Sequence, residues 1–183
     1  MTQRLTPAEV AALTGLDERA IRKDLEHGIF GASSPPRFSF PAVVYFRAIV
    51  LLGLRLGAKD RRQLYRAIAE GLAAGKATVE IGSIAELKLT SVKKEVEEKL
   101  DRFTEWKRRL VTDERILGGE PVFPRSRLAV RRIGAMLLRG ASPEEIREDY
   151  PRLTNEDIEL ARLYTLAYPR LGRPRAQLEA PSR

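Results

Sequence analysis

One segment of this chain has residue types that could bind a phosphate: two adjacent glycines followed by several arginines. The segment ILGGEPVFPRSRLAVRRIGAMLLRG spans residues 116–140, and its arginines at the centre are Arg125, Arg127, Arg131 and Arg132. A nucleotide-binding phosphate loop needs several glycines and a Lys-Ser or Lys-Thr pair that opens a helix. No lysine follows Gly118-Gly119, and Pro121 and Pro124 lack the backbone N–H donors that a phosphate would need. The glycine pair is therefore predicted to form a turn, and the arginines to contact either a phosphate backbone or an acidic protein.

The rest of the chain offers few groups for catalysis. It has no cysteine and a single histidine, His27, which leaves little for thiolate or histidine metal sites. No Gly-x-Ser-x-Gly motif is present, so the sequence lacks the nucleophile elbow that many hydrolases use. The acidic pairs at 97–98 and 144–145 stand at helix positions where carboxylates are ordinarily solvated. We therefore expect no enzyme, no metal and no other cofactor.

Composition predicts a cytoplasmic protein without a membrane span. The absence of cysteine is typical of a reducing compartment, and no basic and apolar leader opens the chain. The most apolar run, residues 42–58, contains Arg47 and Arg55, whereas a membrane helix needs about 20 residues largely free of charge. This run is predicted to be a buried helix.

Basic residues exceed acidic residues mainly at the two ends of the chain, whose net charge is +8. Residues 1–75 have 11 basic and 7 acidic side chains, and residues 76–110 have 9 and 7. Residues 111–168 have 9 and 10, whereas residues 169–183 have 4 and 1. This distribution favours an anionic partner at each end, and a basic domain is typical of nucleic-acid binding.

The elements that position these charges begin with two short helices. Thr6, Pro7 and Glu9 form the N-cap, first-turn proline and capping box of a first helix. Gly15 ends this helix, and Asp17 caps a second one that ends at Gly28. Two short helices joined by a glycine-containing turn predict a helix-turn-helix.

The second helix is predicted to be the recognition helix. Its apolar residues Ala20, Ile21 and Leu25 face inward, so that Arg19, Arg22 and Lys23 face outward. The prolines of ASSPPRFSF predict a loop or short wing that carries Arg37. Arg19, Arg22, Lys23 and Arg37 are therefore predicted to bind DNA, the alternative being that these charges only hydrate a helical surface.

The middle of the chain changes its periodicity twice. Residues 79–89 alternate apolar and polar side chains around Gly82-Ser83, which predicts a β-hairpin. Residues 91–110 then return to helical spacing, with one apolar stripe on an otherwise charged helix: Val92, Val96, Leu100, Phe103, Trp106 and Leu110. Such a stripe packs either against its own domain or against a second copy, and we expect a homodimer.

The fold class predicted from these elements is mainly α. It comprises a winged helix-turn-helix over 1–75, a β-hairpin and amphipathic connecting helix over 76–110, and a helical domain over 111–168. Three helices are expected in that last domain, in a helix-turn-helix-like order, with cap residues at Ser142 and Thr154. Residues 169–183 have three prolines, four arginines and few apolar residues, which predicts a flexible basic tail.

Two resemblances to known families add to this reading. The segments TPAEVAALTGLDERAIRKDLEHGIF and FSFPAVVYFRAIVLLGLRLG lie within residues 5–75 and are similar to the winged helix-turn-helix of MerR-type regulators. In the second half, the distinctive features are Ile116, Gly118-Gly119, Pro121-Val122, Arg127-Leu128, Val130 and LLRGASPEEIREDYPRLTNEDIELA. In this order they resemble a family of unknown function whose bacterial genes lie beside those of PIN-domain toxins. Where that family commonly has Gly-Thr-Arg, this chain has Arg125-Ser126-Arg127.

The second resemblance implies a VapB-type antitoxin of a type II toxin–antitoxin system. Such a protein neutralises a PIN-domain ribonuclease and represses its own operon by binding operator DNA. A PIN nuclease holds its divalent metal ion among carboxylates, and an arginine can pair bidentately with those carboxylates and displace the ion. Arg170, Arg173 and Arg175 are the tail residues predicted to do so. The alternative is a stand-alone MerR-like transcriptional regulator.

Overall fold

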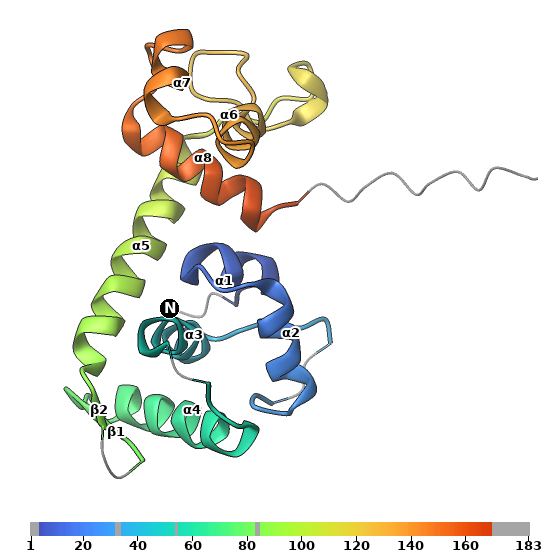
Figure 1. Cartoon of the computed structure of the whole chain (residues 1–183). Coiled ribbons are helices and arrows are strands. Elements are labelled where there is room, and N and C mark those ends of the chain that lie inside the picture. The colour runs from blue at the N-terminus through green and yellow to red at the C-terminus, as the bar shows by residue number, and fades with distance from the viewer. Residues whose placement is uncertain (1–3, 32–33, 54, 83–84, 170–183) are drawn as a thin grey trace, which may run out of the picture.

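Most of the chain is helical in the computed structural model, which describes residues 4–31, 34–53, 55–82 and 85–169. The mainly α fold is confirmed, and so are the small hairpin and the long helix after it. The first 75 residues, called here the N-terminal unit, contain four helices (Figure 1): α1 (Pro7–Thr14), α2 (Glu18–Glu26), α3 (Phe40–Leu52) and α4 (Ala58–Ala73).

The first two helices begin where their cap residues predict. The hydroxyl of Thr6 accepts a hydrogen bond from the backbone N–H of Glu9, and the Glu9 carboxylate accepts one from the Thr6 N–H at 2.8 Å. Gly15 ends α1 with a φ of 77°, a left-handed conformation that costs little without a Cβ. Asp17 then caps α2 through its bond to the Arg19 N–H. Three residues thus separate the two helices.

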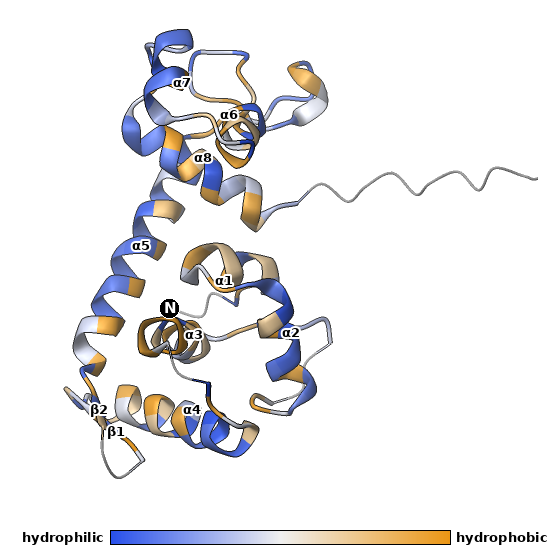
Figure 2. Cartoon of the chain, viewed as in Figure 1, coloured by the Kyte–Doolittle hydropathy of each residue, from blue (hydrophilic) through white to orange (hydrophobic). Residues whose placement is uncertain are grey.

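Helix α3 lies at the centre of the N-terminal unit because its residues are apolar on all sides. Residues 42–46 are all buried, and Figure 2 shows the helix as almost wholly hydrophobic between α1, α2, α4 and α5. Its one charged residue, Arg47, donates to the backbone oxygen of Thr14 and pairs with Glu95 on the long helix α5 at 2.6 Å. Arg47 thereby connects α3 with α1 and with α5.

A two-stranded hairpin and a long helix follow. Strands β1 (Val79–Ile81) and β2 (Ala85–Leu87) are antiparallel, with Val79 opposite Leu87. The hairpin packs tightly on α4, because a Cβ at Gly71 would lie 2.7 Å from Val79 Cγ1. Helix α5 (Leu89–Arg109) then runs from the hairpin past α3 and α1 to α8 (Figure 1).

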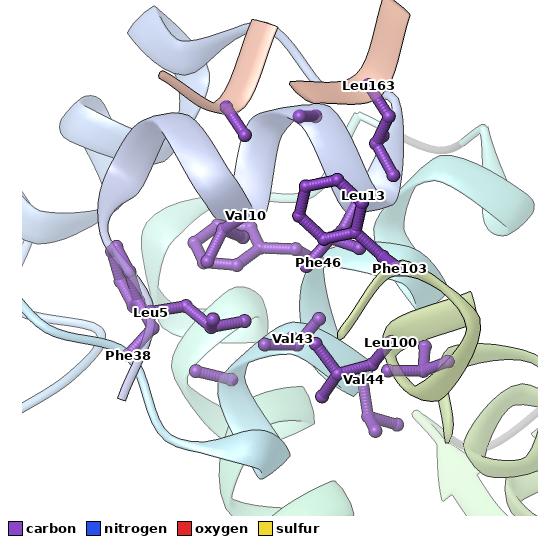
Figure 3. Packing of buried hydrophobic residues seen from close by; sticks show 14 of the residues in the cluster. Leu5, Val10, Leu13, Phe38, Val43, Val44, Phe46, Leu100, Phe103 and Leu163 are labelled. Carbon is purple, nitrogen blue, oxygen red and sulfur yellow. The ribbon is translucent and has the colours of Figure 1, made fainter. Parts of the chain in front are cut away.

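The apolar stripe of α5 is buried inside the chain. Val92, Val96, Leu100, Phe103 and Trp106 are all less than a tenth exposed, and Leu110 is half-buried. Figure 3 shows Leu100 and Phe103 in one cluster with Leu13, Val44 and Leu163. The structure therefore corrects the expectation that this stripe is a seam for a second copy: it packs against the chain's own helices, and a dimer needs a different surface.

Residues 111–168, called here the C-terminal unit, contain a short 3-10 turn and three α-helices: η1 (Leu117–Gly119), α6 (Val130–Leu138), α7 (Pro143–Asp149) and α8 (Asn155–Ala167). Capping boxes begin α7 at Ser142 with Glu145 and α8 at Thr154 with Asp157. Helices α6 and α8 cross closely at Gly134, where an added Cβ would lie 2.4 Å from the Ala161 carbonyl oxygen. Glycine is required there by space alone.

The two units share one hydrophobic core. Helix α8 packs against α1 as well as against α6, and buried residues of both units, such as Val10 and Leu163, belong to one cluster (Figure 3). Helix α5 contacts α1, α3, α4 and α8 and so lines both units. Within the described part of the chain, no helix is both long enough and apolar enough to cross a membrane.

Candidate nucleic-acid interface

A buried carboxylate holds α2 against the rest of the N-terminal unit. Asp24 lies on the inward face of α2 and is fully buried. Its carboxylate accepts hydrogen bonds from the Tyr45 hydroxyl at 2.9 Å and from the Arg61 guanidinium at 2.5 Å. Because Tyr45 is on α3 and Arg61 on α4, this network fixes the orientation of α2 relative to both helices.

The tyrosine of this network stays protonated. Burial raises the pKa of Tyr45, and the adjacent Asp24 carboxylate raises it further. A protonated hydroxyl donates to the carboxylate, so the buried Asp24 is paired with one positive charge, that of the partly buried Arg61. Breaking such a pair is costly because the remaining charge is left buried and unpaired.

The opposite face of α2 carries three cations. Arg19, Arg22 and Lys23 are all exposed, and spacings of three and four residues place them side by side on one helix face. Arg22 also pairs with Glu18 one turn earlier; with 60% of its side chain exposed, a phosphate can compete for it. The acidic Glu26 shares the exposed surface of this helix.

The predicted wing returns to the start of α1. Phe38 pairs with Leu5 as an isolated antiparallel bridge, with N···O distances of 2.8 and 3.0 Å in the two directions. Phe38 is buried and meets Phe30 edge to face, with the ring centroids 5.3 Å apart. Arg37 precedes this anchor and is exposed. The base of the loop is therefore held by packing, and a basic side chain stands beside it.

The exposed side chains of this surface are of types that can contact DNA. An arginine can donate two hydrogen bonds to guanine O6 and N7 in the major groove, whereas lysine mainly neutralises phosphate. An α-helix fits the major groove, and the buried network leaves the cationic face of α2 turned outward. The structure brings Arg19, Arg22 and Lys23 together on one element and places Arg37 on a separate loop.

The Gly118-Gly119 pair forms a turn, as the sequence predicts. Gly118 and Gly119 have φ values of 65° and 81°, and the backbone N–H of Gly119 donates to the Ile116 oxygen. A second turn follows at residues 123–128, although arginine stands there in place of glycine. Arg125 adopts a φ of 56°, and the turn closes through the bond from the Phe123 N–H to the Leu128 oxygen.

The four arginines near these turns have different environments. Arg125, Arg127 and Arg132 are exposed, and the Arg132 guanidinium lies 5.9 Å from the centroid of the Tyr150 ring. Arg131 instead points inward: its guanidinium donates to the Tyr168 carbonyl, lies over the Tyr164 ring and stands 3.7 Å from the Glu120 carboxylate. Arg131 is therefore engaged inside the C-terminal unit.

Acidic residues at the start of α8 are neutralised by α5. Arg102 pairs with Glu156 and Glu159, and Arg109 pairs with Glu156 at 3.4 Å. These pairs are solvent-exposed and individually weak. They do, however, place a surface of mixed charge where α5 meets α8. The tail arginines Arg170, Arg173 and Arg175 lie outside the described residues.

Asp24, Tyr45 and Arg61 are the positioning residues that the sequence did not single out. Asp24 stands three residues after buried Ile21, so its carboxylate falls on the apolar face of α2, and a charge there requires a partner. The sequence could therefore predict that Asp24 has a partner, but not which residues the partners are. Among the residues that the structure describes, no group of three or more His, Cys, Asp or Glu side chains could hold a metal ion.

Comparisons with known proteins bear on the C-terminal unit. The comparison with curated proteins finds no match, and neither does that with solved structures. Residues 110–165, from the end of α5 to within α8, match the model of a protein family of unknown function, DUF433. The C-terminal unit is thus similar to DUF433 proteins.

Proposed function

We propose that this protein is a cytoplasmic antitoxin without enzymatic activity. In this proposal it binds operator DNA through α2 and neutralises a PIN-domain ribonuclease with its basic tail, residues 169–183. The observation that carries the proposal is the pair of opposed faces on α2. Asp24 is fully buried in a network with two other helices, while Arg19, Arg22 and Lys23 are exposed on the other side.

The charge distribution supports two separate anionic partners. The N-terminal unit has a surplus of basic residues and offers the exposed cations of α2 together with Arg37 to a duplex. The tail has four basic residues and one acidic residue, which suits a carboxylate-lined nuclease site. The match of residues 110–165 to DUF433 supports the resemblance to the family encoded beside PIN-domain toxins.

A stand-alone MerR-like regulator is the second candidate. The contact between α8 and α1 favours it, because a change in the C-terminal unit would reach the first helix of the helix-turn-helix directly. The two candidates differ in their partner: an antitoxin copurifies with a ribonuclease encoded by the neighbouring gene, and a stand-alone regulator does not.

The DNA-binding arm is tested by charge reversal on α2. The double variant Arg22→Glu with Lys23→Glu should lose binding to a fragment of the chain's own promoter in an electrophoretic mobility shift. The matched control is Lys93→Glu with Lys94→Glu, which changes the net charge equally; both lysines pair with a glutamate four residues away, as Arg22 does. Figure 1 places α5 and α2 on opposite sides of α1 and α3. An equal loss of DNA binding in both variants would mean that net charge, and not the position of the cations on α2, controls binding.

The toxin-binding arm is tested by removing residues 170–183. This deletion keeps Tyr168, whose carbonyl accepts from Arg131, so the C-terminal unit retains its described contacts. The shortened protein should leave the partner ribonuclease active while the promoter fragment is still bound. Full inhibition by the shortened protein would exclude the tail as the inhibitory segment and leave the DNA-binding arm untouched.

A homodimer belongs to the same proposal. Helix-turn-helix proteins commonly read two related half-sites as symmetric dimers. Because the stripe on α5 is buried in the monomer, the dimer surface must lie elsewhere on the chain. Light scattering of the full-length protein gives the mass directly, and a monomer that binds its operator one to one would remove the dimer from the proposal.

A further inference from the structure

A cavity of about 670 Å³ opens where three parts of the chain meet. The end of α5 forms one wall, the turn at 123–128 forms the second, and the connection between α7 and α8 forms the third. Cavities of this size are typical of small-molecule sites. Neither operator binding by α2 nor nuclease binding by the tail makes use of it.

The floor of this cavity is aromatic. Trp106 and Phe123 are almost fully buried, and their rings meet edge to face with centroids 6.2 Å apart. Apolar side chains surround them on the remaining walls: Leu110, Pro124, Leu128, Pro151 and Leu153. Because the two rings are almost fully buried, the surface that a ligand can touch comes chiefly from the half-buried Leu110 and Leu128 and the exposed Pro124 and Pro151, and it favours an apolar ligand.

The polar groups at the floor already have partners. The indole N–H of Trp106 donates to Asp157 Oδ1 at 2.9 Å. The other oxygen of Asp157 accepts from the backbone N–H and the hydroxyl of Thr154. The Asp157 carboxylate is thus committed to the start of α8, and it does not make the cavity a cation site.

The rim is basic. Arg125 and Arg152 are both exposed, and neither forms an ion pair with any residue in the described ranges. Arg109 adds a third guanidinium, which also forms an ion pair with Glu156 at 3.4 Å. Asp149 is the remaining carboxylate of the lining. Three guanidinium groups against one uncommitted carboxylate favour an anion, which arginine binds with two parallel hydrogen bonds.

We propose that this cavity binds a small amphipathic anion, with its apolar body against the apolar walls that cover Trp106 and Phe123 and its anionic group at Arg125 and Arg152. The walls come from α5 and from the segment similar to DUF433, so the site requires both parts of the chain. The proposal is independent of DNA and toxin binding: either can fail while the cavity still takes its ligand.

The aromatic sulfonate 8-anilinonaphthalene-1-sulfonate is a suitable probe, because it joins a flat apolar body to an anion. Trp106 is the single tryptophan of the chain and lines this cavity, so a probe bound there lies beside the tryptophan, and the arginine variants below assign the site. The probe should quench Trp106 emission by energy transfer in the native full-length protein and saturate at one molecule per chain. N-phenyl-1-naphthylamine, the neutral analogue, should bind about tenfold more weakly because it lacks the charge-assisted hydrogen bonds.

Three variants locate the anion. Arg125→Gly removes a guanidinium at a residue whose φ of 56° suits glycine, so the fold is retained. This variant and Arg152→Ala should each weaken sulfonate binding about tenfold and leave the neutral analogue unchanged. Arg127→Ala, an exposed arginine in the same turn that does not line the cavity, should bind as the wild type does. Equal weakening by Arg127→Ala, equal affinity for both probes, or absence of Trp106 quenching would each overturn the proposal.

Discussion

The hydroxyl of Tyr168 donates a hydrogen bond to the carboxylate of Glu9 at 2.7 Å, joining residues at opposite ends of the folded chain. Glu9 uses its other oxygen to cap α1 through the Thr6 N–H. The Lys107 ammonium of α5 donates to the same hydroxyl at 2.7 Å. Burial, and then the neighbouring Glu9, raises the pKa of Tyr168, so the hydroxyl remains a donor at neutral pH. One tyrosine thus connects α8 with α1 and α5.

Replacing this tyrosine should weaken the junction between the two units. Tyr168→Phe removes both hydrogen bonds, and we expect a loss of about 1 kcal/mol in the free energy of unfolding, since water can still reach the half-buried partners. Urea unfolding followed by Trp106 fluorescence measures it. Tyr150→Phe is the control, because the Tyr150 hydroxyl makes no hydrogen bond to any residue that the structure describes; an equal loss there would contradict the role of the Tyr168 hydroxyl.

The buried network of Asp24 should be far more sensitive. Asp24→Ala leaves the Arg61 guanidinium without its carboxylate and the Tyr45 hydroxyl without its acceptor, and we expect a loss of about 3–5 kcal/mol. Arg61→Ala tests the same pair from the other side. The double variant should lose clearly less than the two single losses together, by about 1–3 kcal/mol. Strict additivity in chemical unfolding would mean that the two side chains act independently.

Acid should destabilise the C-terminal unit through Asp157. Burial by itself would raise the pKa of this carboxyl, but hydrogen bonds from Thr154 and then Trp106 outweigh it and hold the pKa below the ordinary value of 3.8. A lowered folded-state pKa contributes stability above the unfolded-state pKa, and that stability is lost as the pH falls through the folded-state pKa. Unfolding free energies of the wild type should therefore decrease more steeply than those of Asp157→Asn below about pH 4.

The matched control for this acid effect is Asp149→Asn. Asp149 is exposed, lies close to Asp157 in sequence and accepts no hydrogen bond from the described residues. Its variant should keep the wild-type dependence on pH. If Asp157→Asn lost stability in acid as steeply as the wild type, the hydrogen bonds at the start of α8 would not control the pKa.

The close approach of α6 and α8 at Gly134 gives a prediction that depends on packing and not on charge. A Cβ at Gly134 would lie 2.0 Å from Thr165 Oγ1 and 2.4 Å from the Ala161 carbonyl oxygen, and the latter is helix backbone that cannot rotate away. Gly134→Ala should therefore lower the free energy of unfolding by about 3 kcal/mol. Gly31→Ala is the control, because its Cβ meets no atom within 4 Å and its φ is ordinary. A thermal shift of similar size in both variants would contradict the close crossing.

Binding to operator DNA should depend steeply on salt if α2 and Arg37 neutralise phosphates. An increase from about 50 to 200 mM salt should weaken binding by about a hundredfold if the three exposed cations of α2 and Arg37 each neutralise one phosphate, because bound cations are released from the duplex on association. Fluorescence anisotropy of a labelled promoter fragment measures this dependence. Arg37→Ala should reduce its slope by about one contact, and a nearly flat response in the wild type would exclude phosphate neutralisation by this surface.

Helix boundaries were largely predictable because their determinants are local. Thr6 with Glu9, Ser142 with Glu145 and Thr154 with Asp157 close capping boxes over three residues, so each depends little on what the helix packs against. The turn at Gly118-Gly119 likewise follows from backbone preferences. The turn at 123–128 was harder to predict, because Arg125 adopts a left-handed conformation that ordinarily favours glycine.

The candidate interface was predictable in part. Spacing alone places Arg19, Arg22 and Lys23 on one face of a helix, and the structure shows all three exposed. Spacing also puts Asp24 on the opposite face, but it does not reveal that Tyr45 and Arg61 meet it there. Those partners lie 21 and 37 residues away in sequence, and their contact depends on how three helices are oriented.

The amino-acid sequence by itself determined the order of the elements, their caps, the cationic face of α2 and the absence of cysteine, because each depends on neighbouring residues or on composition. Only the tertiary structure shows that the apolar stripe of α5 packs against the chain's own helices, since such a stripe could pack equally well against a second copy. It also decided that Trp106 lines a cavity and that Tyr168 meets Glu9 across 159 residues of chain. These contacts form between surfaces whose relative position is set by the whole core, which no local pattern encodes.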